Sequence, residues 1–178
     1  MDNNIITEAK GREYAFLMIG YDMPLEIKTI QEKLPDDIIY FEPDKENMYG
    51  KEKEPHVTLA AQLDNNTDLE SLKSLVKTLP EYTAYIKGIS LFNNEKYDVL
   101  KCDVVCQELF DTNKRILEKH PSYSEFKDYI PHMTIAYLKK GQGSNFIKNL
   151  DKLIKITPNS FIYSWIDSDD EKKITFEK

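Results

Sequence analysis

Two short segments with the same residue pattern constrain the fold of this chain more than any other feature. They read PHVTL at residues 55–59 and PHMTI at residues 131–135. In each, a histidine and a threonine stand two positions apart between proline and apolar residues. Because side chains alternate between the two faces of a β-strand, each segment is predicted to project one imidazole and one hydroxyl from the same face.

The two segments together predict one site for acid–base chemistry. Only three histidines occur in the sequence, and two of them lie in this pattern. Imidazole is the side-chain group that normally titrates near neutral pH. If the two strands face each other, the cluster of four side chains suits concerted proton transfer at a phosphorus centre. These side chains are His56, Thr58, His132 and Thr134.

Length and composition predict one domain. The chain has 178 residues, of which 40% are hydrophobic, and a chain of this size buries a proper core. We expect a polar tail over residues 1–11 and a single domain over residues 12–178, acting as a monomer. The apolar stretch near the N-terminus is too short for a signal peptide or a membrane span, so the sequence predicts a cytoplasmic protein with no membrane partner.

Charge and cysteine content argue against two further kinds of site. A net charge of −7 argues against a broad nucleic-acid-binding surface, although local lysines can still serve a small anionic ligand. The two cysteines, Cys102 and Cys106, are too few for a zinc set and are predicted to be core or free thiols. No metal and no cofactor is predicted.

Helix and strand signals alternate along the chain. Besides the two motif segments, strands are expected at residues 14–19, 37–41, 82–92, 97–105, 161–166 and 173–176. Helices are expected at residues 24–34, from residue 67 or 68 to 79, at 107–119 and at 144–155. The two motif histidines are 76 residues apart, close to half the chain. We therefore predict an α+β fold of two lobes related by an approximate twofold axis, with largely antiparallel sheets around a central cleft and the helices outside.

With these motifs the chain resembles the 2H phosphoesterase superfamily, the LigT-like fold whose members include RNA 2′,3′-cyclic phosphodiesterases and 2′-5′ RNA ligase-like proteins. The resemblance covers nearly the whole chain. It includes the strand after Arg12, the approach GKEKEPHVTL, the strand YDVLKCDV and the segment HPSYSEFKDYIPHMTIAYLKKG. The block over residues 97–141 is similar to small 2H proteins of bacteriophage genomes.

The resemblance implies a role for each motif residue. His56 and His132 match the two catalytic histidines, one a general base and the other a general acid. Thr58 and Thr134 match the hydroxyls that hold the non-bridging phosphate oxygens. Two neutral hydroxyls and one imidazolium also suit a singly charged phosphodiester on physical grounds, without a metal. The sequence does not tell which histidine is the base and which is the acid.

Strand alternation predicts which residues surround this cluster. Ala60 and Gln62 follow on the face of His56, and Ala136 follows on the face of His132, so that the alanines leave room for a ligand. The same alternation predicts that Tyr137 points away into the core. Gln62 is thus a candidate for substrate binding.

Aromatic and basic residues supply further candidates for substrate binding. Tyr163 and Trp165 share one face of a predicted strand with Phe161, where they either stack a nucleobase or pack within the sheet. Lys101 shares a strand face with Asp103 and is a candidate for phosphate contact. Lys139 follows the second motif and is either a ligand contact or a solvated lysine.

Three functions are compatible with these residues. The first is a metal-independent phosphodiesterase that cleaves a small cyclic or 2′-5′-linked oligonucleotide, which the bacteriophage resemblance connects with viral evasion of nucleotide-based host immunity. The second is an RNA-end enzyme that acts on 2′,3′-cyclic phosphates or 2′-5′ linkages. The third is a binding protein that sequesters a nucleotide without cleaving it.

Overall fold

The computed structural model describes residues 14–43, 48–64, 66–79, 83–124, 128–166 and 171–176, with the backbone alone from residue 165 onward. The predicted polar tail over residues 1–11 lies outside this part. The strands are β1 (Tyr14–Tyr21), β2 (His56–Asp64), β3 (Ala84–Asn93), β4 (Tyr97–Val105), β5 (His132–Lys139), β6 (Lys148–Ile156), β7 (Pro158–Ile166) and β8 (Glu171–Phe176). The helices are α1 (Leu25–Glu32), α2 (Leu69–Lys77) and α3 (Gln107–Lys119), with short 3-10 turns η1 (Asp36–Ile38) and η3 (Ser144–Phe146).

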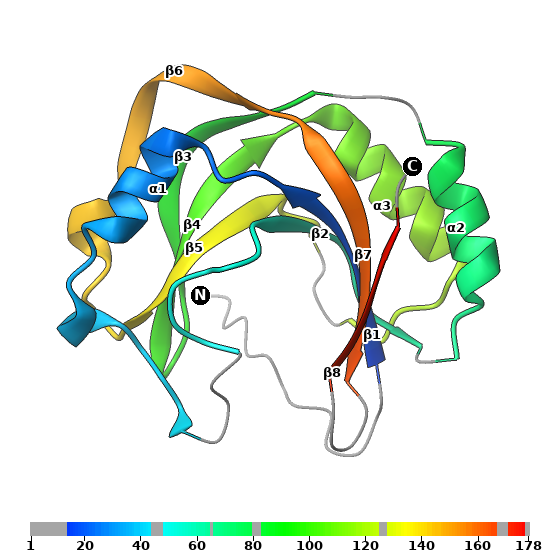
Figure 1. Cartoon of the computed structure of the whole chain (residues 1–178), viewed down its shortest axis with the longest axis horizontal. Coiled ribbons are helices and arrows are strands. Elements are labelled where there is room, and N and C mark those ends of the chain that lie inside the picture. The colour runs from blue at the N-terminus through cyan, green and yellow to red at the C-terminus, as the bar shows by residue number, and fades with distance from the viewer. Residues whose placement is uncertain are drawn as a thin grey trace.

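All eight strands form one antiparallel sheet in the order β6-β3-β4-β5-β2-β1-β7-β8. The sheet is strongly curved, with α1 beside one half and α2 and α3 beside the other (Figure 1). The predicted α+β class with antiparallel pairing and outer helices is therefore confirmed. The strands join into a single continuous sheet.

One face of the sheet carries the hydrophobic core. Along β1, Ala15, Leu17 and Ile19 are fully buried, and they join one apolar cluster with residues of the helices. Leu72 of α2 and Ile116 of α3 belong to that cluster. The intervening β1 residues project from the opposite face. This second face is concave and carries the candidate site described below.

The two motif strands are neighbours at the centre of the sheet and separate after one residue pair. β2 and β5 pair only at Val57 and Met133. Beyond this point, Ala136 of β5 pairs with Lys51, and β2 pairs with Ser122 through its Leu63. Beyond the shared pair, the neighbour of each motif strand is thus the segment of chain that leads to the other motif. The two halves of the sheet therefore splay apart with approximate twofold symmetry.

The two halves of the sheet are not the two halves of the chain. One half contains β1, β2, β7 and β8, and the other contains β3 to β6. The first half therefore combines strands from both ends of the sequence with one motif, and the second is a continuous central segment that contains the other. Each half supplies one motif strand to the centre of the sheet.

The predicted strand at residues 37–41 is largely replaced by η1. Its only strand-like pairing in the described structure is a single bridge between Ile39 and Leu138 of β5. Asp36 and Asp37 follow Pro35 at the start of the turn, where acidic residues are favourable next to free backbone N–H groups. Ile39 is buried in the core, so the apolar residues of this segment anchor a turn.

The predicted helix at residues 144–155 is also wrong. Its first turn is η3, and the rest is β6, which pairs with β3 at the edge of the sheet. The spacing of Leu150, Leu153 and Ile154 fits a helix by sequence. In the strand, Leu150 and Ile154 pack against the core while Leu153 is 57% exposed. The open edge of β3 offers backbone hydrogen bonds that outweigh this weak helical preference.

Candidate active site

The structure brings the four motif side chains together on the concave face. The antiparallel pair of Val57 and Met133 sets His56 across from Thr134 and Thr58 across from His132. We call these four side chains the quartet. They lie on adjacent strands of one sheet and on the same face of it.

Both quartet histidines are held in the same way. His56 Nδ1 lies 2.7 Å from the carbonyl oxygen of Glu54, and His132 Nδ1 lies 2.8 Å from that of Ile130. A carbonyl oxygen only accepts, so Nδ1 carries the hydrogen in each neutral ring and Nε2 carries the lone pair. Each ring therefore presents Nε2 for proton transfer to a ligand.

The surroundings of His132 favour its neutral form. Burial lowers the pKa of His132 to about 4, and the positive charges of Lys101 and His56 lower it further, against the opposing effects of the bond to Ile130 and the charge of Asp103. The ring of Phe92 packs against the imidazole edge to face, with centroids 4.8 Å apart. At neutral pH His132 is therefore an uncharged imidazole ready to accept a proton.

Lys101 is a buried ammonium beside the quartet. It stands opposite Thr134 on β4 and is only 4% exposed. Its Nζ lies 2.6 Å from Asp103 Oδ1 and 2.7 Å from Ser90 Oγ, and 4.4 Å from the centroid of the Phe92 ring. Burial alone would raise the pKa of Asp103, but hydrogen bonds from Lys101 and Ser90 hold it below its usual range. Lys101 thus lies on the face predicted for it, and its contact with phosphate stays a prediction.

Each motif strand bulges directly after its threonine. In β2, Thr58 pairs with Met18 and Ala60 with Leu17, so one extra residue interrupts the alternation. In β5, Thr134 pairs with Lys101 and Ala136 with Leu100, with the same consequence. The predicted positions of Ala60 and Ala136 on the site face are therefore wrong, since both are opposite residues of the core face.

The bulged residues are anchored by helices on the core side. Asn113 of α3 donates from Nδ2 to the carbonyl oxygen of Leu59 at 2.7 Å. Gln31 of α1 donates from Nε2 to that of Ile135 at 2.8 Å. Each bulge carbonyl therefore has an amide partner, and the two motif strands bend in equivalent ways.

The bulges also change the neighbouring predictions. Tyr137 is opposite Val99, which shares a strand face with Lys101, so Tyr137 projects toward the site and the prediction that it lies in the core is wrong. Gln62 lies beyond a second register shift and has a left-handed backbone with φ of 51°. Strand alternation therefore gives no support for placing Gln62 beside His56.

Phe161 and Tyr163, two of the three aromatic residues predicted on one strand face, lie in the core. Phe161 and Tyr163 are opposite Ile19 and Leu17 and are only 3% and 4% exposed. Their rings belong to the hydrophobic core, so Tyr163 is wrong as a substrate contact. Trp165 pairs with Ala15 in the same strand, but its side chain lies outside the described part of the structure.

Lys139 lies at the far end of the same face. It is the last residue of β5, is opposite Tyr97, and is exposed. Tyr137 stands between Lys139 and the quartet on this strand face. Lys139 is thus separated from the place where the quartet would hold a phosphate, and only an extended ligand would reach both.

Sequence reasoning missed four tyrosines that gather beside the quartet, Tyr40, Tyr49, Tyr97 and Tyr137. Their neighbouring ring centroids lie 5.0 to 5.6 Å apart, mostly edge to face. We call them the tyrosine cluster. Tyr40 and Tyr49 come from irregular segments whose backbones pair with β5, so no periodic pattern in the sequence joins the four. The bulge of β5 turns Tyr137 toward the other three rings.

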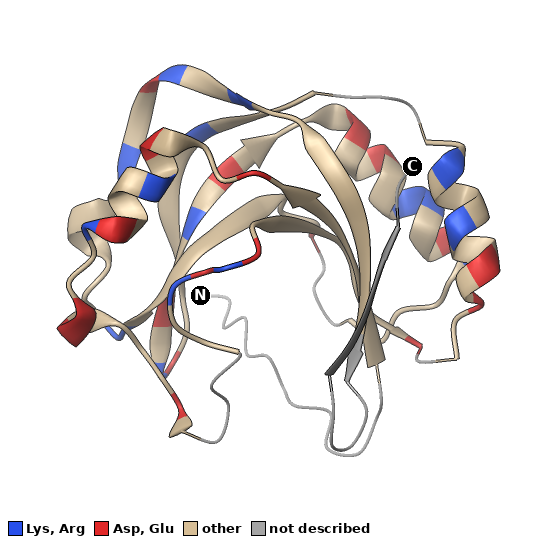
Figure 2. Ribbon diagram, viewed as in Figure 1, with Lys and Arg blue, Asp and Glu red and all other residues tan. Residues whose placement is uncertain are grey.

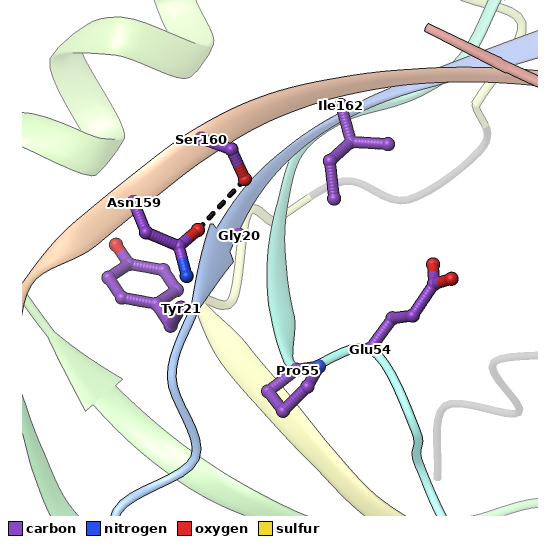
Figure 3. A pocket seen from close by; sticks show the side chains of 7 residues that line it. All are labelled: Gly20, Tyr21, Glu54, Pro55, Asn159, Ser160 and Ile162. Carbon is purple, nitrogen blue, oxygen red and sulfur yellow. Dashed lines mark hydrogen bonds between the residues drawn. The ribbon is translucent and has the colours of Figure 1, made fainter. Parts of the chain in front are cut away.

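An open pocket of about 220 Å³ adjoins the other side of His56. Gly20 is opposite His56 on β1, and Ser160 of β7 lies next to it (Figure 3). A side chain at Gly20 would collide with Ser160 Oγ and come within 2.7 Å of Asn159 Oδ1. Glycine at this position therefore preserves open space beside the candidate acid–base group.

Charge is mixed over the described surface. Both acidic and basic residues occur on each of the three helices and among the strands (Figure 2). Among the residues described, no group of three or more His, Cys, Asp or Glu side chains is arranged to hold a metal ion. Within the same residues, no helix has the length and apolarity that a membrane crossing requires.

The other titratable candidates lie outside the quartet. Cys102 and Cys106 are free thiols, and burial raises the pKa of Cys102 to about 12 and that of Cys106 to about 11. Thiols with such pKa values are poor nucleophiles at neutral pH. His120 is the residue directly after α3 and is 6% exposed.

This architecture is the LigT-like fold that the two motifs predicted from their resemblance to 2H phosphoesterases. The chain is similar to TT0787 of Thermus thermophilus, with a TM-score of 0.59 and 14% identity over 92% of this chain and 95% of that one. It is also similar to E. coli LigT complexed with 3′-AMP, with a TM-score of 0.53 and 13% identity over 93% and 95% of the two chains. No protein-family model matches the sequence, and a search of curated proteins finds no relative. At these identities the likeness establishes the fold.

Proposed function

We propose that this protein is a nucleotide phosphodiesterase that uses His56 and His132 as a general acid and a general base. One observation carries the proposal, namely the matched hydrogen bonds from each Nδ1 to the carbonyl two residues earlier. They present two Nε2 atoms to the same space, flanked by two threonine hydroxyls. Such a pair suits proton transfer on opposite sides of one phosphorus atom.

The lowered pKa of His132 supports a direction for the reaction. His132 Nε2 takes the proton of the attacking hydroxyl, which belongs to water or to the free ribose hydroxyl beside the phosphate, 2′ in a 3′-5′ linkage and 3′ in a 2′-5′ linkage. The new oxygen–phosphorus bond forms and the bond to the leaving oxygen breaks. Protonated His56 gives its Nε2 proton to that leaving oxygen, so the proton count balances.

The remaining groups neutralise charge on the phosphorus centre. Thr58 and Thr134 are placed to donate to the non-bridging oxygens, where negative charge accumulates in the pentacoordinate state. Lys101 adds a buried positive charge next to Thr134. Hydroxyls, imidazoles and this ammonium account for the chemistry without a metal ion.

The substrate that we propose is a small cyclic or 2′-5′-linked oligonucleotide. Mixed surface charge supports a small ligand over a long nucleic acid. LigT of E. coli, with the same fold, has been solved with 3′-AMP and with NADP+. A role in evading nucleotide-based host immunity rests on the resemblance to bacteriophage proteins.

A substrate panel tests this proposal. The protein is incubated with EDTA and cyclic dinucleotides, 2′-5′ oligoadenylate or nucleoside 2′,3′-cyclic phosphates, and the products are separated by chromatography. Cleavage of the first two classes is expected. Turnover of 2′,3′-cyclic phosphates alone would favour the RNA-end enzyme, and tight binding without any cleavage would favour the sequestering protein. Activity that disappears with EDTA would contradict a metal-independent mechanism.

The pH dependence tests the direction of proton transfer. If His132 is the general base, kcat/KM should stay high as the pH falls and decline only near pH 4, because the base works in its neutral form. An ordinary histidine would lose this form near pH 6.5. Measuring kcat/KM between pH 4 and 9 checks this, and an acid limb near pH 6.5 would contradict the assignment.

Folding stability should change over the same pH window. The folded-state pKa of His132 lies below its unfolded value, so the unfolded chain binds this proton first as the pH falls. His132 therefore contributes stability that is present above about pH 6.5 and is lost toward pH 4. Urea unfolding of the His132→Gln variant should show a shallower decline in this window than the unmodified protein.

A further inference from the structure

The tyrosine cluster lies on the same face of the sheet as the quartet. On β4, Lys101 is opposite Thr134, and Val99, two residues away on the same strand face, is opposite Tyr137. Tyr97 is the next residue of β4 on this face. Tyr137 is therefore the first residue of β5 after Thr134 that faces the site.

Backbone hydrogen bonds hold the cluster in place. The N–H of Tyr137 donates to the carbonyl of Gly50 at 2.8 Å, and its carbonyl accepts from the N–H of Tyr40 at 3.0 Å. The hydroxyl of Tyr40 donates to Glu42 Oε1 at 2.5 Å. These bonds join β5 to the segment that carries Tyr49, so the rings are arranged before any ligand arrives.

Core packing does not explain these rings. All four are only partly buried, and none belongs to the buried cluster that forms the core on the opposite face. A group of aromatic rings that keeps accessible edges next to a phosphate-binding centre matches the way proteins stack nucleobases. The phenols of Tyr40 and Tyr137 have raised pKa values, chiefly because of the hydrogen bond to Glu42 in one and burial in the other, so they stay neutral.

The cluster adjoins one end of the quartet. Thr134, which the cluster follows on β5, is the quartet member across from His56. His56 is the general acid in the proposed function, so the leaving oxygen lies on this side. When the free ribose hydroxyl beside the phosphate attacks it, the 2′-hydroxyl in a 3′-5′ linkage or the 3′-hydroxyl in a 2′-5′ linkage, the oxygen that leaves is O5′ of the following nucleotide.

We propose that the tyrosine cluster binds the nucleobase of the nucleoside that leaves through its 5′-oxygen. The inference rests on the proposed function for its direction, because it identifies the leaving side with His56. It defines the substrate as a molecule with a nucleobase on the leaving side of the scissile phosphate. A nucleotide with only one base, on the attacking side, would leave this surface empty.

Binding of two isomeric nucleotides tests the proposal. Adenosine 5′-monophosphate carries its base on the leaving side of the phosphate, adenosine 3′-monophosphate carries it on the attacking side, and ribose 5-phosphate has no base. Calorimetry with the full chain should show Tyr97→Leu weakening the 5′-isomer roughly tenfold. The 3′-isomer and ribose 5-phosphate should change less than about twofold, and Tyr97→Phe should retain affinity because it keeps the ring.

Two results would overturn the inference. One is equal affinity of the unmodified protein for the 5′-isomer and ribose 5-phosphate, and the other is an equal loss for all three ligands in Tyr97→Leu. If Tyr97→Leu does not fold, the test is made by NMR on the unmodified protein, where contacts between adenine protons and the Tyr97 ring are expected. The Tyr97→Phe variant is used to assign the Tyr97 signals. Absence of these contacts would also overturn it.

The same experiment separates this inference from the proposed function. Base-dependent binding at Tyr97 without cleavage of any panel substrate would contradict phosphodiesterase activity and leave the nucleobase site standing. Cleavage that does not depend on the Tyr97 ring would support phosphodiesterase activity and contradict the nucleobase site.

Discussion

Replacing His132 or His56 by alanine is expected to lower kcat at least about a thousandfold, since each removes one proton-transfer step. Removing both should lower kcat only a little more than removing one, because the two groups act on the same transition state. Each ring projects from the concave face, and its main hydrogen bond is to a carbonyl of the neighbouring loop. Single-turnover kinetics and thermal unfolding of the variants measure the two effects separately.

The third histidine is the matched control. His120 ends α3 and takes no part in the proposed chemistry. His120→Gln should retain kcat within about twofold, whatever its effect on unfolding, because it touches no reacting group. Activity retained in both His56→Ala and His132→Ala would refute the two-histidine mechanism.

Replacing Lys101 by methionine is expected to lower kcat/KM by roughly two to three orders of magnitude, the effect typical of losing a preorganised electrostatic group. The ammonium is buried opposite Thr134, next to the place where the proposed mechanism develops negative charge. Its loss also leaves the Asp103 carboxylate near His132 without its cation. The pKa of His132 should therefore rise, and the acid limb of the pH profile should move upward.

A second variant separates these two effects. Lys101→Met with Asp103→Asn removes both charges, so the acid limb should return toward that of the unmodified protein while kcat/KM stays low. Breaking one partner of a buried pair is also more destabilising than removing both. Full activity and an unchanged pH profile in Lys101→Met would show that Lys101 is purely structural.

The quartet could be predicted from the sequence because strand alternation over three residues leaves little freedom. The helix at residues 107–119 was predicted with its observed bounds, since Leu109, Thr112 and Ile116 follow helical spacing into the core. Strand alternation failed two residues later in each motif strand. A bulge needs only one extra residue and has no composition of its own, so nothing in the string predicted that Tyr137 faces the site.

The difference between the two histidines was equally invisible in the sequence. Both have proline before them and threonine two positions later. Burial, reinforced by the charge of Lys101 on β4, lowers the pKa of His132, and Phe92 of β3 packs against its ring. Both residues lie about thirty to forty positions before His132. Sheet pairing across that separation, and not the local pattern, places a positive charge and an aromatic ring beside this imidazole.

The arrangement of the sheet has a consequence for synthesis on the ribosome. β1 emerges first, but one of its two neighbours is β7, which starts at Pro158. Throughout elongation the nascent chain therefore exposes the apolar edge of β1, which is a template for pairing with other chains. Products truncated before Pro158 would keep both motifs and yet be prone to aggregate, and the pocket lined by Gly20 and Pro55 is complete only after β7 has been made.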